Sequence, residues 1–295
     1  MLAVVGTVPE QNFPLVIGRV VLEGNVICIE GSRAPVNRGT PALLAAAIKV
    51  GEALGQPPPV GYLAGDIGLG EGSRLLYARL SETAVNDDIS AIAFHYLQPD
   101  VDWHNRVLFT VEEMKKRPVL IADAGFMYAA KMSGQAPNYD LFTPDAGELA
   151  FLADEEAPHP FYTRGFILHE EIKVPTLIER AYQYENAATC LLVKGQPDYV
   201  ADQKGIYASV DTPAEAAMEA IGGTGDTITG IVAALICAGL EVKEAAVLAA
   251  RVNRMAGHLA AATPATQVMD IVEQIPRALV QVSKEHNVMG GIHYG

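Results

Sequence analysis

Short apolar segments alternate with helical segments along most of the chain, and this alternation limits the fold more than any other feature. The apolar segments carry almost no charge, which is typical of strands buried on both faces of a sheet. They lie at 60–64, 89–94, 119–122, 141–142 and 190–193. Helical patterns separate most of them, at 72–80, 111–116, 125–132, 146–152 and 176–186. This order predicts an α/β fold with a mostly parallel sheet that helices cover on both sides.

Both ends of the chain depart from this alternation. Residues 16–22 and 26–29 flank a Glu-Gly-Asn turn, which predicts a β-hairpin. A helix is indicated over 41–54, because Thr40 precedes a proline at the first helical position. Three helices are predicted to close the chain, near 224–238, 242–262 and 266–285.

The sequence contains no repeat and no low-complexity segment. The proline-rich stretch at 157–160 is interpreted as a loop and not as a linker. Residues 1–295 are therefore expected to form a single domain, and a hydrophobic content of 50% provides ample material for its core.

The net negative charge of the chain limits the kinds of molecule that it is expected to bind. A formal net charge of −14 argues against sequence-independent binding to nucleic acid or to an anionic membrane, because both need a basic surface. The net charge does not exclude binding of an anionic small molecule, since backbone amides at helix N-termini can bind phosphate.

The pattern of apolar residues and cysteines bears on location. No apolar run approaches the ~18 residues of a membrane span, and the N-terminus lacks the pattern of a signal peptide. The three cysteines lie in apolar stretches, which fits a reducing compartment. We therefore expect a cytoplasmic protein that acts on a small molecule, and homo-oligomer formation stays open.

A glycine-rich loop, Gly222-Gly223-Thr224-Gly225-Asp226, directly precedes an unusually apolar helix. Its glycines allow the backbone to turn tightly, and the helix that follows presents unpaired amides and a partial positive charge. The loop therefore predicts a binding site for phosphate groups. An aspartate repels such an anion unless it handles a proton or a metal, so Asp226 is a candidate general base. The alternative is that Asp226 merely caps the helix.

Other polar residues follow the predicted strands, where ligands collect in parallel sheets. Lys194 and Gly195 come directly after the segment 190–193, and Asp123 ends the segment 119–122. Lys194 is a candidate phosphate ligand, or else a solvated surface lysine. Glu148 begins a helix, where it either complements the helix dipole or holds a metal-bound water.

Three other motifs were weighed and rejected. The stretch 65–72 follows a strand and precedes a helix, but it lacks the third glycine of a dinucleotide-binding fingerprint. The histidines are scattered without metal-ligand spacing, so a zinc site is not expected. The sequence also has no Gly-Lys-Ser/Thr motif of the Walker type.

Residues 222–231 resemble the nucleotide-site signature of the ribokinase-like superfamily, in the form found in the ADP/ATP-dependent NAD(P)H-hydrate dehydratases. The resemblance covers roughly residues 118–262. It includes four further segments: 119–124 (a strand ending in Asp-Ala-Asp in that family), 143–149 (Thr-Pro-His-x-Gly-Glu), 192–195 (a Lys-Gly strand end) and 249–261 (the helix beside the adenine).

This resemblance implies a three-layer sandwich with a mostly parallel central sheet, and ADP or ATP with Mg²⁺ as cofactors. Asp226 would be the acid or base at the reacting hydroxyl, and no metal site made of protein ligands alone is implied. The residues expected beside the nucleotide are Gly222, Gly223, Thr224, Gly225, Lys194, Gly195 and Asn253. Those expected near the substrate or a metal-bound water are Asp123, Asp145 and Glu148.

In the dehydratases, phosphate transfer to the hydroxyl of the hydrate makes a leaving group, and elimination restores the nicotinamide ring. In the kinases of the superfamily the same aspartate deprotonates an alcohol, and phosphorylation ends the reaction. We expect a dehydratase. A kinase for a sugar or vitamin precursor and a non-catalytic nucleotide-binding protein stay open, although Asp226 argues against the latter because its charge would weaken phosphate binding.

The sequence departs from the dehydratase pattern on the substrate side. Asp145 stands where the family has histidine, and 95–99 (His-Tyr-Leu-Gln-Pro) replaces Gly-Pro-Gly-Leu-Gly. Residues 212–220, predicted to be helical, replace a run of Asn, Gly and Met. Bulk near Leu97 and the negative charge of Asp145 are expected to hinder a bulky anionic dinucleotide.

Overall fold

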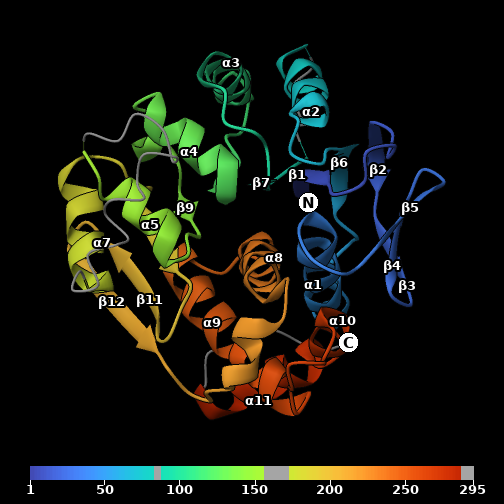
Figure 1. The fold of residues 1–295 in the computed structure, drawn as a ribbon, viewed down its shortest axis with the longest axis vertical. Coiled ribbons are helices and arrows are strands. Elements are labelled where there is room, and N and C mark those ends of the chain that lie inside the picture. Colours follow the sequence, from blue (N-terminus) through green and yellow to red (C-terminus); the bar gives the residue numbers. More distant parts are fainter. Residues whose placement is uncertain (83–87, 156–172, 287–295) are drawn as a thin grey trace.

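The computed structural model describes residues 1–82, 88–155 and 173–286. The strands of its larger sheet are β1 (Leu2–Val8), β2 (Val16–Arg19), β6 (Val60–Gly65), β7 (Ala91–His95), β8 (Val119–Ala122), β9 (Leu141–Phe142), β10 (Cys190–Val193), β11 (Asp198–Asp202) and β12 (Gly205–Val210). They follow the order β12-β11-β10-β9-β8-β7-β1-β6-β2 (Figure 1). A smaller sheet at one side contains β3 (Val21–Glu23), β4 (Val26–Ile29) and β5 (Ser32–Pro35).

The middle of the larger sheet is parallel. Each neighbouring pair from β10 to β6 runs parallel, whereas β2 at one edge and β11 and β12 at the other run antiparallel to their neighbours. This confirms the predicted mostly parallel sheet. The central strand β1 was missing from the predicted strands, although all of its residues are buried.

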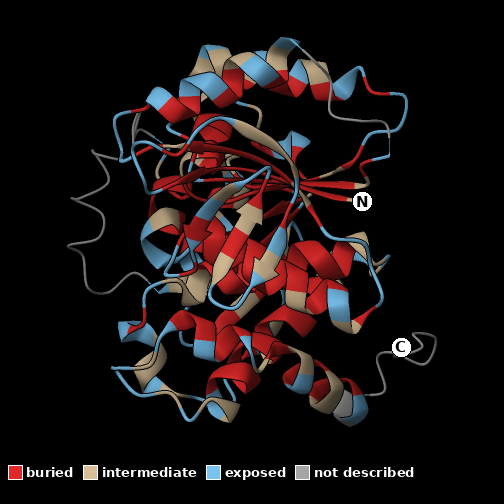
Figure 2. Cartoon of the chain, turned by 90° about the vertical axis from the view of Figure 1, so that its right-hand side faces the viewer, coloured by how far each residue is buried: buried red, intermediate tan, exposed pale blue. Residues whose placement is uncertain are grey.

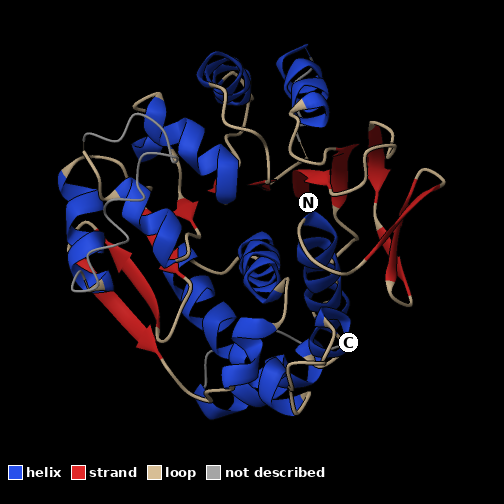
Figure 3. Cartoon of the chain, viewed as in Figure 1, coloured by secondary structure: helices blue, strands red, loops and turns tan. Residues whose placement is uncertain are grey.

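Helices cover both faces of the sheet, which gives three layers (Figures 2 and 3). One face packs against α1 (Thr40–Ala53), α8 (Thr224–Cys237) and α9 (Val242–Leu259). On the outer side of this layer, α10 (Val268–Val272) and α11 (Ile275–His286) pack against α1 and α9. The other packs against α2 (Glu71–Glu82), α3 (Val101–Glu112), α4 (Ala124–Met132), α5 (Ala146–Leu152) and α7 (Val174–Gln183).

The alternation of side chains along a strand explains why there are two cores. In β1, Leu2 and Val4 enter the core beneath α1 and α8, whereas Ala3 and Val5 enter the core on the opposite face. A strand buried on both faces must be apolar at every position, which is the pattern from which the sheet was predicted.

Three predicted elements are wrong in their boundaries. The helix predicted at 111–116 lies earlier, as α3, because Asp100 caps it by accepting a hydrogen bond from the Trp103 amide at 3.0 Å. The last predicted helix is divided into α10 and α11, since Pro276 has no amide hydrogen to continue a helix. The segment 212–220 is helical only at Ala216–Ala220, in a short 3-10 helix that follows Pro213.

The prediction of an N-terminal hairpin from 16–22 and 26–29 is also partly wrong. The chain leaves the larger sheet after Arg19, so β2 pairs with β6 while β3 pairs with β4. The loop predicted at 157–160 lies outside the described residues. Within the described part of the chain, no helix combines the length and the apolar character needed to cross a membrane.

Candidate active site

The glycine-rich loop forms the sharp entry to α8. Gly223 is the N-cap residue of α8 and has a φ of 99°, a left-handed conformation that suits glycine. A Cβ at this position would lie 3.0 Å from Val268 and 3.2 Å from the Cα of Arg38, so the space is closed as well. Asp226 lies in the first turn of α8 and is not its cap, which excludes the alternative capping role.

The N-terminus of α8 faces the carboxyl ends of the parallel strands, and α8 occupies the middle of its helix layer (Figure 1). The hydroxyl of Thr229 donates a hydrogen bond to Asp123 at 2.8 Å and lies 3.0 Å from the hydroxyl of Thr143. Asp123 and Thr143 follow β8 and β9. Lys194, which follows β10, donates through Nζ to both carboxylate oxygens of Asp123 at 3.0 Å. The structure therefore brings together the strand-end residues that the sequence selected.

Both carboxylate oxygens of Asp226 accept hydrogen bonds. The backbone amide of Gly39 donates to Oδ2 at 2.6 Å, and Nε2 of His95 lies 3.1 Å from Oδ1. Gly39 is the N-cap residue of α1, so the carboxylate lies at the N-terminal ends of both α1 and α8. Helix N-termini favour a negative charge.

These contacts decide the charge of Asp226. Burial raises the pKa of the carboxyl, but the hydrogen bond with His95, the charge of Lys194 and the Gly39 amide together outweigh it. The pKa of Asp226 is therefore lower than its ordinary value. The side chain is ionised at neutral pH, as a general base must be.

His95 is a site residue to which the sequence analysis gave no role. It ends β7, and its side chain is completely buried between Asp226 and Thr40. The available signal was its position directly after the apolar segment 89–94, because the same rule selected Asp123 and Lys194.

Lys194 is an ion-pair partner as well as a candidate phosphate ligand. Burial lowers the pKa of its ammonium group. The carboxylates of Asp123, Glu148 and Asp226 raise this pKa by more than burial lowers it, so the net shift is upward. A Cβ on Gly225 would lie 3.8 Å from Nζ, which places this permanent cation beside the first turn of α8.

Asp145 and Glu148 form a capping box at the start of α5. Asp145 accepts from the Glu148 amide at 2.7 Å, and Glu148 accepts from the Asp145 amide at 2.9 Å. Although Glu148 is half-buried, removal from water is the main cause that raises its pKa to about 8; Asp123 and Asp145 also raise it, while Lys194 lowers it. Their role near substrate or metal-bound water stays a prediction.

Two cavities lie next to partners of Asp226: Gly225, its neighbour in the chain, lines the first, and Gly39, whose amide donates to it, lines the second. The first, which we term the nucleotide cavity, has a volume of about 390 Å³ and includes six of the predicted site residues in its lining. These are Asp145, Lys194, Gly195, Thr224, Gly225 and Asn253. The other five predicted site residues, Gly222, Gly223, Asp226, Asp123 and Glu148, are not part of this lining.

The second cavity, which we term the Arg38 cavity, has a volume of about 360 Å³. It is lined by Thr7, Pro9, Arg38, Gly39, Asp66, Ile67, Gly68, Tyr96 and Gln98. The Gly39 amide joins it to Asp226. Leu97 is buried in the core, so the bulk expected from this segment comes from Tyr96, which is 49% exposed.

The rejected dinucleotide fingerprint has a different function in the structure. The carboxylate of Asp66 accepts hydrogen bonds from the amides of Gly68, Gly70 and Ser73 at 2.9–3.0 Å. An internal anion therefore occupies the amides that a bound phosphate would need.

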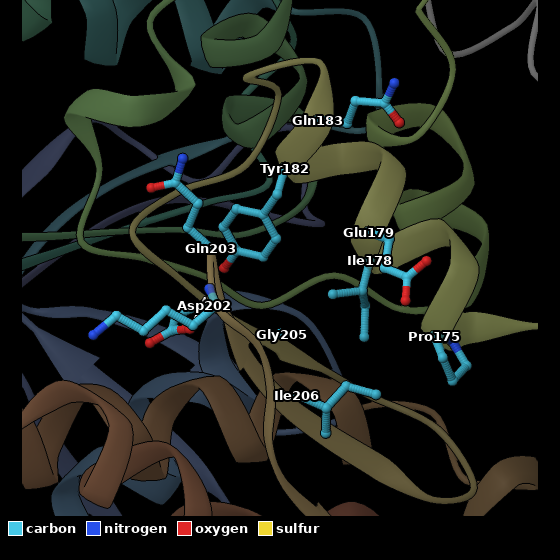
Figure 4. Close-up of a pocket in the computed structure, with 10 residues that line it drawn as sticks. Pro175, Ile178, Glu179, Tyr182, Gln183, Asp202, Gln203, Gly205 and Ile206 are labelled. Carbon is cyan, nitrogen blue, oxygen red and sulfur yellow. Dashed lines mark hydrogen bonds between the residues drawn. The ribbon is translucent and has the colours of Figure 1, made fainter.

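A larger cavity, of about 430 Å³, lies away from this chemistry (Figure 4). Its walls come from α7 and from the turn between β11 and β12, including Ile178, Tyr182 and Ile206. It contains none of the predicted site residues, so size alone does not identify the active site here.

A family model described as NAD(P)H-hydrate dehydratase matches residues 97–277. An uncharacterised protein from Methanocaldococcus jannaschii is 42% identical over 221 residues, which cover 75% of this chain and 90% of that protein. A bifunctional NAD(P)H-hydrate repair enzyme from Pyrobaculum aerophilum is 31% identical over 176 residues, covering 59% of this chain and 32% of the enzyme. The match thus spans about a third of the bifunctional enzyme.

A solved structure supports the fold. The ADP/ATP-dependent NAD(P)H-hydrate dehydratase from Bacillus subtilis, co-crystallised with ATP and Mg²⁺ and soaked with CoA, superimposes with a TM-score of 0.61 and 16% identity. The superposition covers 95% of this chain and 91% of that chain. It confirms the predicted ribokinase-like sandwich.

Proposed function

Because this chain belongs to the NAD(P)H-hydrate dehydratase family, we propose that it uses ADP or ATP to convert a hydrated nicotinamide dinucleotide back to NADH or NADPH. The observation that carries the proposal is the position of Asp226. This ionised carboxylate lies between the nucleotide cavity, which Gly225 lines, and the Arg38 cavity, which Gly39 lines.

The nucleotide cavity suits the phosphates of ADP or ATP. The amides at the N-terminus of α8 and the cation of Lys194 provide positive charge, and Gly225 leaves room for a phosphate group. Arg254 is held beside this cavity by a 2.7 Å ion pair with Asp198 and also donates to the carbonyl of Gly195 at 2.7 Å. Asn253 donates to the carbonyl of Thr224, which fixes the loop against α9.

The proposed reaction has two stages. Asp226 accepts the proton of the substrate hydroxyl while that oxygen bonds to the terminal phosphorus of the nucleotide, whose bond to the bridging oxygen breaks. The phosphate group then leaves with the former hydroxyl oxygen. Loss of a proton from the neighbouring ring carbon restores the double bond, so the elements of water are removed and the nucleotide loses one phosphate.

Mg²⁺ fits this cavity as a companion of the nucleotide. Mg²⁺ usually keeps several waters and binds phosphates together with one or two carboxylates. Asp145 lines the cavity and Glu148 is hydrogen-bonded to it, so these two carboxylates would face the waters of a nucleotide-bound Mg²⁺. Among the described residues, no cluster of acidic, histidine or cysteine side chains is arranged to hold a metal alone.

The test is to incubate the protein with hydrated NADH, Mg²⁺ and ADP or ATP, and to follow recovery of the absorbance of the dihydronicotinamide ring. We expect recovery that requires the nucleotide and is absent from Asp226→Asn. Phosphate transfer to a small alcohol, without recovery from the hydrate with either nucleotide, would contradict the proposal in favour of a kinase. The single domain, the cytoplasmic location and homo-oligomer formation stay predictions from the sequence.

A further inference from the structure

His95 connects three elements that are distant in the sequence. It ends β7, its Nε2 lies 3.1 Å from Asp226 in α8, and its Nδ1 lies 3.0 Å from the hydroxyl oxygen of Thr40 in α1. His95 and Thr40 are both completely buried. The imidazole is therefore fixed at both nitrogens, and one of them contacts the proposed base.

The surroundings of His95 leave its ring little freedom. Tyr96 packs against it edge to face, with ring centroids 4.4 Å apart, and has a φ of 54° that is unusual for a tyrosine. Thr7 holds the turn by donating to the carbonyl of Tyr96 at 2.8 Å. A Cβ on Gly6 would lie 2.6 Å from the Thr40 hydroxyl, so glycine in β1 allows Thr40 to approach the ring.

The hydroxyl of Thr40 indicates which nitrogen carries the proton. Among the described residues, Nδ1 of His95 is the acceptor within hydrogen-bond distance of this buried hydroxyl. A buried hydroxyl donates where an acceptor is present, so Nδ1 accepts and Nε2 carries the hydrogen. Nε2 then donates to Oδ1 of Asp226, while the Gly39 amide donates to Oδ2.

We propose that His95 is a positioning residue for Asp226: anchored by Thr40, it fixes the plane of the carboxylate and keeps it ionised and directed at the substrate hydroxyl. This inference rests on the proposed function, because it assigns Asp226 the role of base. The proton of the substrate moves to Asp226 in the same step as before, and His95 gains and loses no proton in it.

Other charged groups face this pair, and they set the direction of the expected pH effect. Nε2 of His95 also lies 3.7 Å from Asp123, whose charge is paired with Lys194. Glu148 and the hydroxyl of Tyr96 lie farther out and interact with the same charges. Lys194 and the Gly39 amide continue to favour the charged form of Asp226 without His95, so loss of the histidine weakens this effect and does not abolish it.

Two substitutions separate positioning from packing. In His95→Gln the amide nitrogen can occupy the place of Nε2 and donate to Asp226, whereas in His95→Asn the shorter side chain cannot reach it. Both remove the imidazole from the core, and the shorter Asn leaves the larger gap, which the melting temperature reports. We would measure kcat and KM against pH, the Kd of ADP, and the melting temperature of both variants beside Asp226→Asn.

We expect His95→Asn to lower kcat by ~10–100-fold, a part of the total effect of a general base. The acidic limb of its pH profile should move to higher pH, because Asp226 loses a donor that favours its charged form. His95→Gln should recover most of kcat and return the limb towards that of the parent protein. The Kd of ADP should change little in either variant.

Equal losses of kcat in His95→Gln and His95→Asn, with an unmoved acidic limb, would make His95 a packing residue and overturn the inference. Full activity of His95→Asn beside an inactive Asp226→Asn would also overturn it, while the proposed function stands. Full activity of Asp226→Asn would overturn the proposed function itself, and the inference with it.

Discussion

The two cavities that flank Asp226 are built differently. The nucleotide cavity uses the N-terminus of α8 and the ends of parallel strands, and its lining lies within the residues 97–277 matched by the family model. The Arg38 cavity uses loops and side chains of the N-terminal third, and of its lining only Gln98 falls inside that match. Phosphate binding depends on backbone geometry that many sequences share, whereas the shape of the Arg38 cavity depends on particular side chains of this chain.

The largest effect on catalysis is expected from a substitution of Asp226, which lies between the two cavities. Asp226→Asn keeps the shape of the side chain but cannot accept the proton, so kcat should fall by ~10²–10⁴-fold. The affinity for ADP should hold or rise, because a negative charge near the phosphates has been removed. Steady-state kinetics and calorimetric titration with ADP check the two halves of this prediction. A parallel loss of ADP binding would mean that Asp226 belongs to the nucleotide side alone.

A substitution on the nucleotide side should abolish binding. Millimolar ADP or ATP with Mg²⁺ should raise the melting temperature of the parent protein. The added stability should be ~3–4 kcal/mol if the ligand exceeds its Kd by 10²–10³-fold. Gly225→Val should remove this stabilisation, because its branched side chain fills the space proposed for phosphate. Gly225→Ala is the control, since a Cβ there makes ordinary contact with Lys194 at 3.6 Å. Thermal shifts in Gly225→Val equal to those of the parent would contradict the proposed phosphate site.

A substitution in the Arg38 cavity should affect binding of the hydrate and leave nucleotide binding unchanged. Tyr96→Ala removes an aromatic ring that is 49% exposed at the cavity, so the KM for hydrated NADH should fall by about tenfold, because the bulk expected to hinder the dinucleotide is gone. Stabilisation by ADP should stay at the parent value. Weaker ADP binding by Tyr96→Ala, with an unchanged KM for the hydrate, would contradict the assignment of the two cavities to different ligands.

The smallest expected effect is the contribution of Glu148 to the pH dependence of folding stability. The pKa of Glu148 is raised from 4.5 to about 8 in the folded protein, mainly by burial and with contributions from nearby carboxylates. The folded state therefore holds a proton that the unfolded state has released, and this group lowers the stability as the pH rises from about 5 to 8. Glu148→Gln should remove that part of the pH dependence while still accepting from the Asp145 amide. Melting curves across this pH range check it, and identical slopes for the two proteins would contradict the raised pKa.

The sequence predicted the nucleotide side because its signals are local. Three glycines before an apolar helix, and a lysine or aspartate directly after a buried strand, each constrain the backbone within a few residues. The pairing of His95 with Asp226 spans 131 positions, and no local pattern contains it. The position of α3 was also missed, because apolar residues indicated a helix at 111–116, whereas the helix is capped at Asp100 and ends at Glu112.

The strand β1 begins at residue 2 yet lies near the middle of the sheet, between β6 and β7. During synthesis β1 leaves the ribosome before β6 and β7, so Ala3 cannot pair with Val60, nor Leu2 with Ala91, until those later strands have been made. The contact between Gly39 and Asp226 requires a loop of 187 positions to close. Such long-range closures slow folding, because chain entropy is lost before the contacts form. Asp226, the proposed base, can therefore acquire its hydrogen bonds with Gly39 and His95 only after these distant parts of the chain have come together.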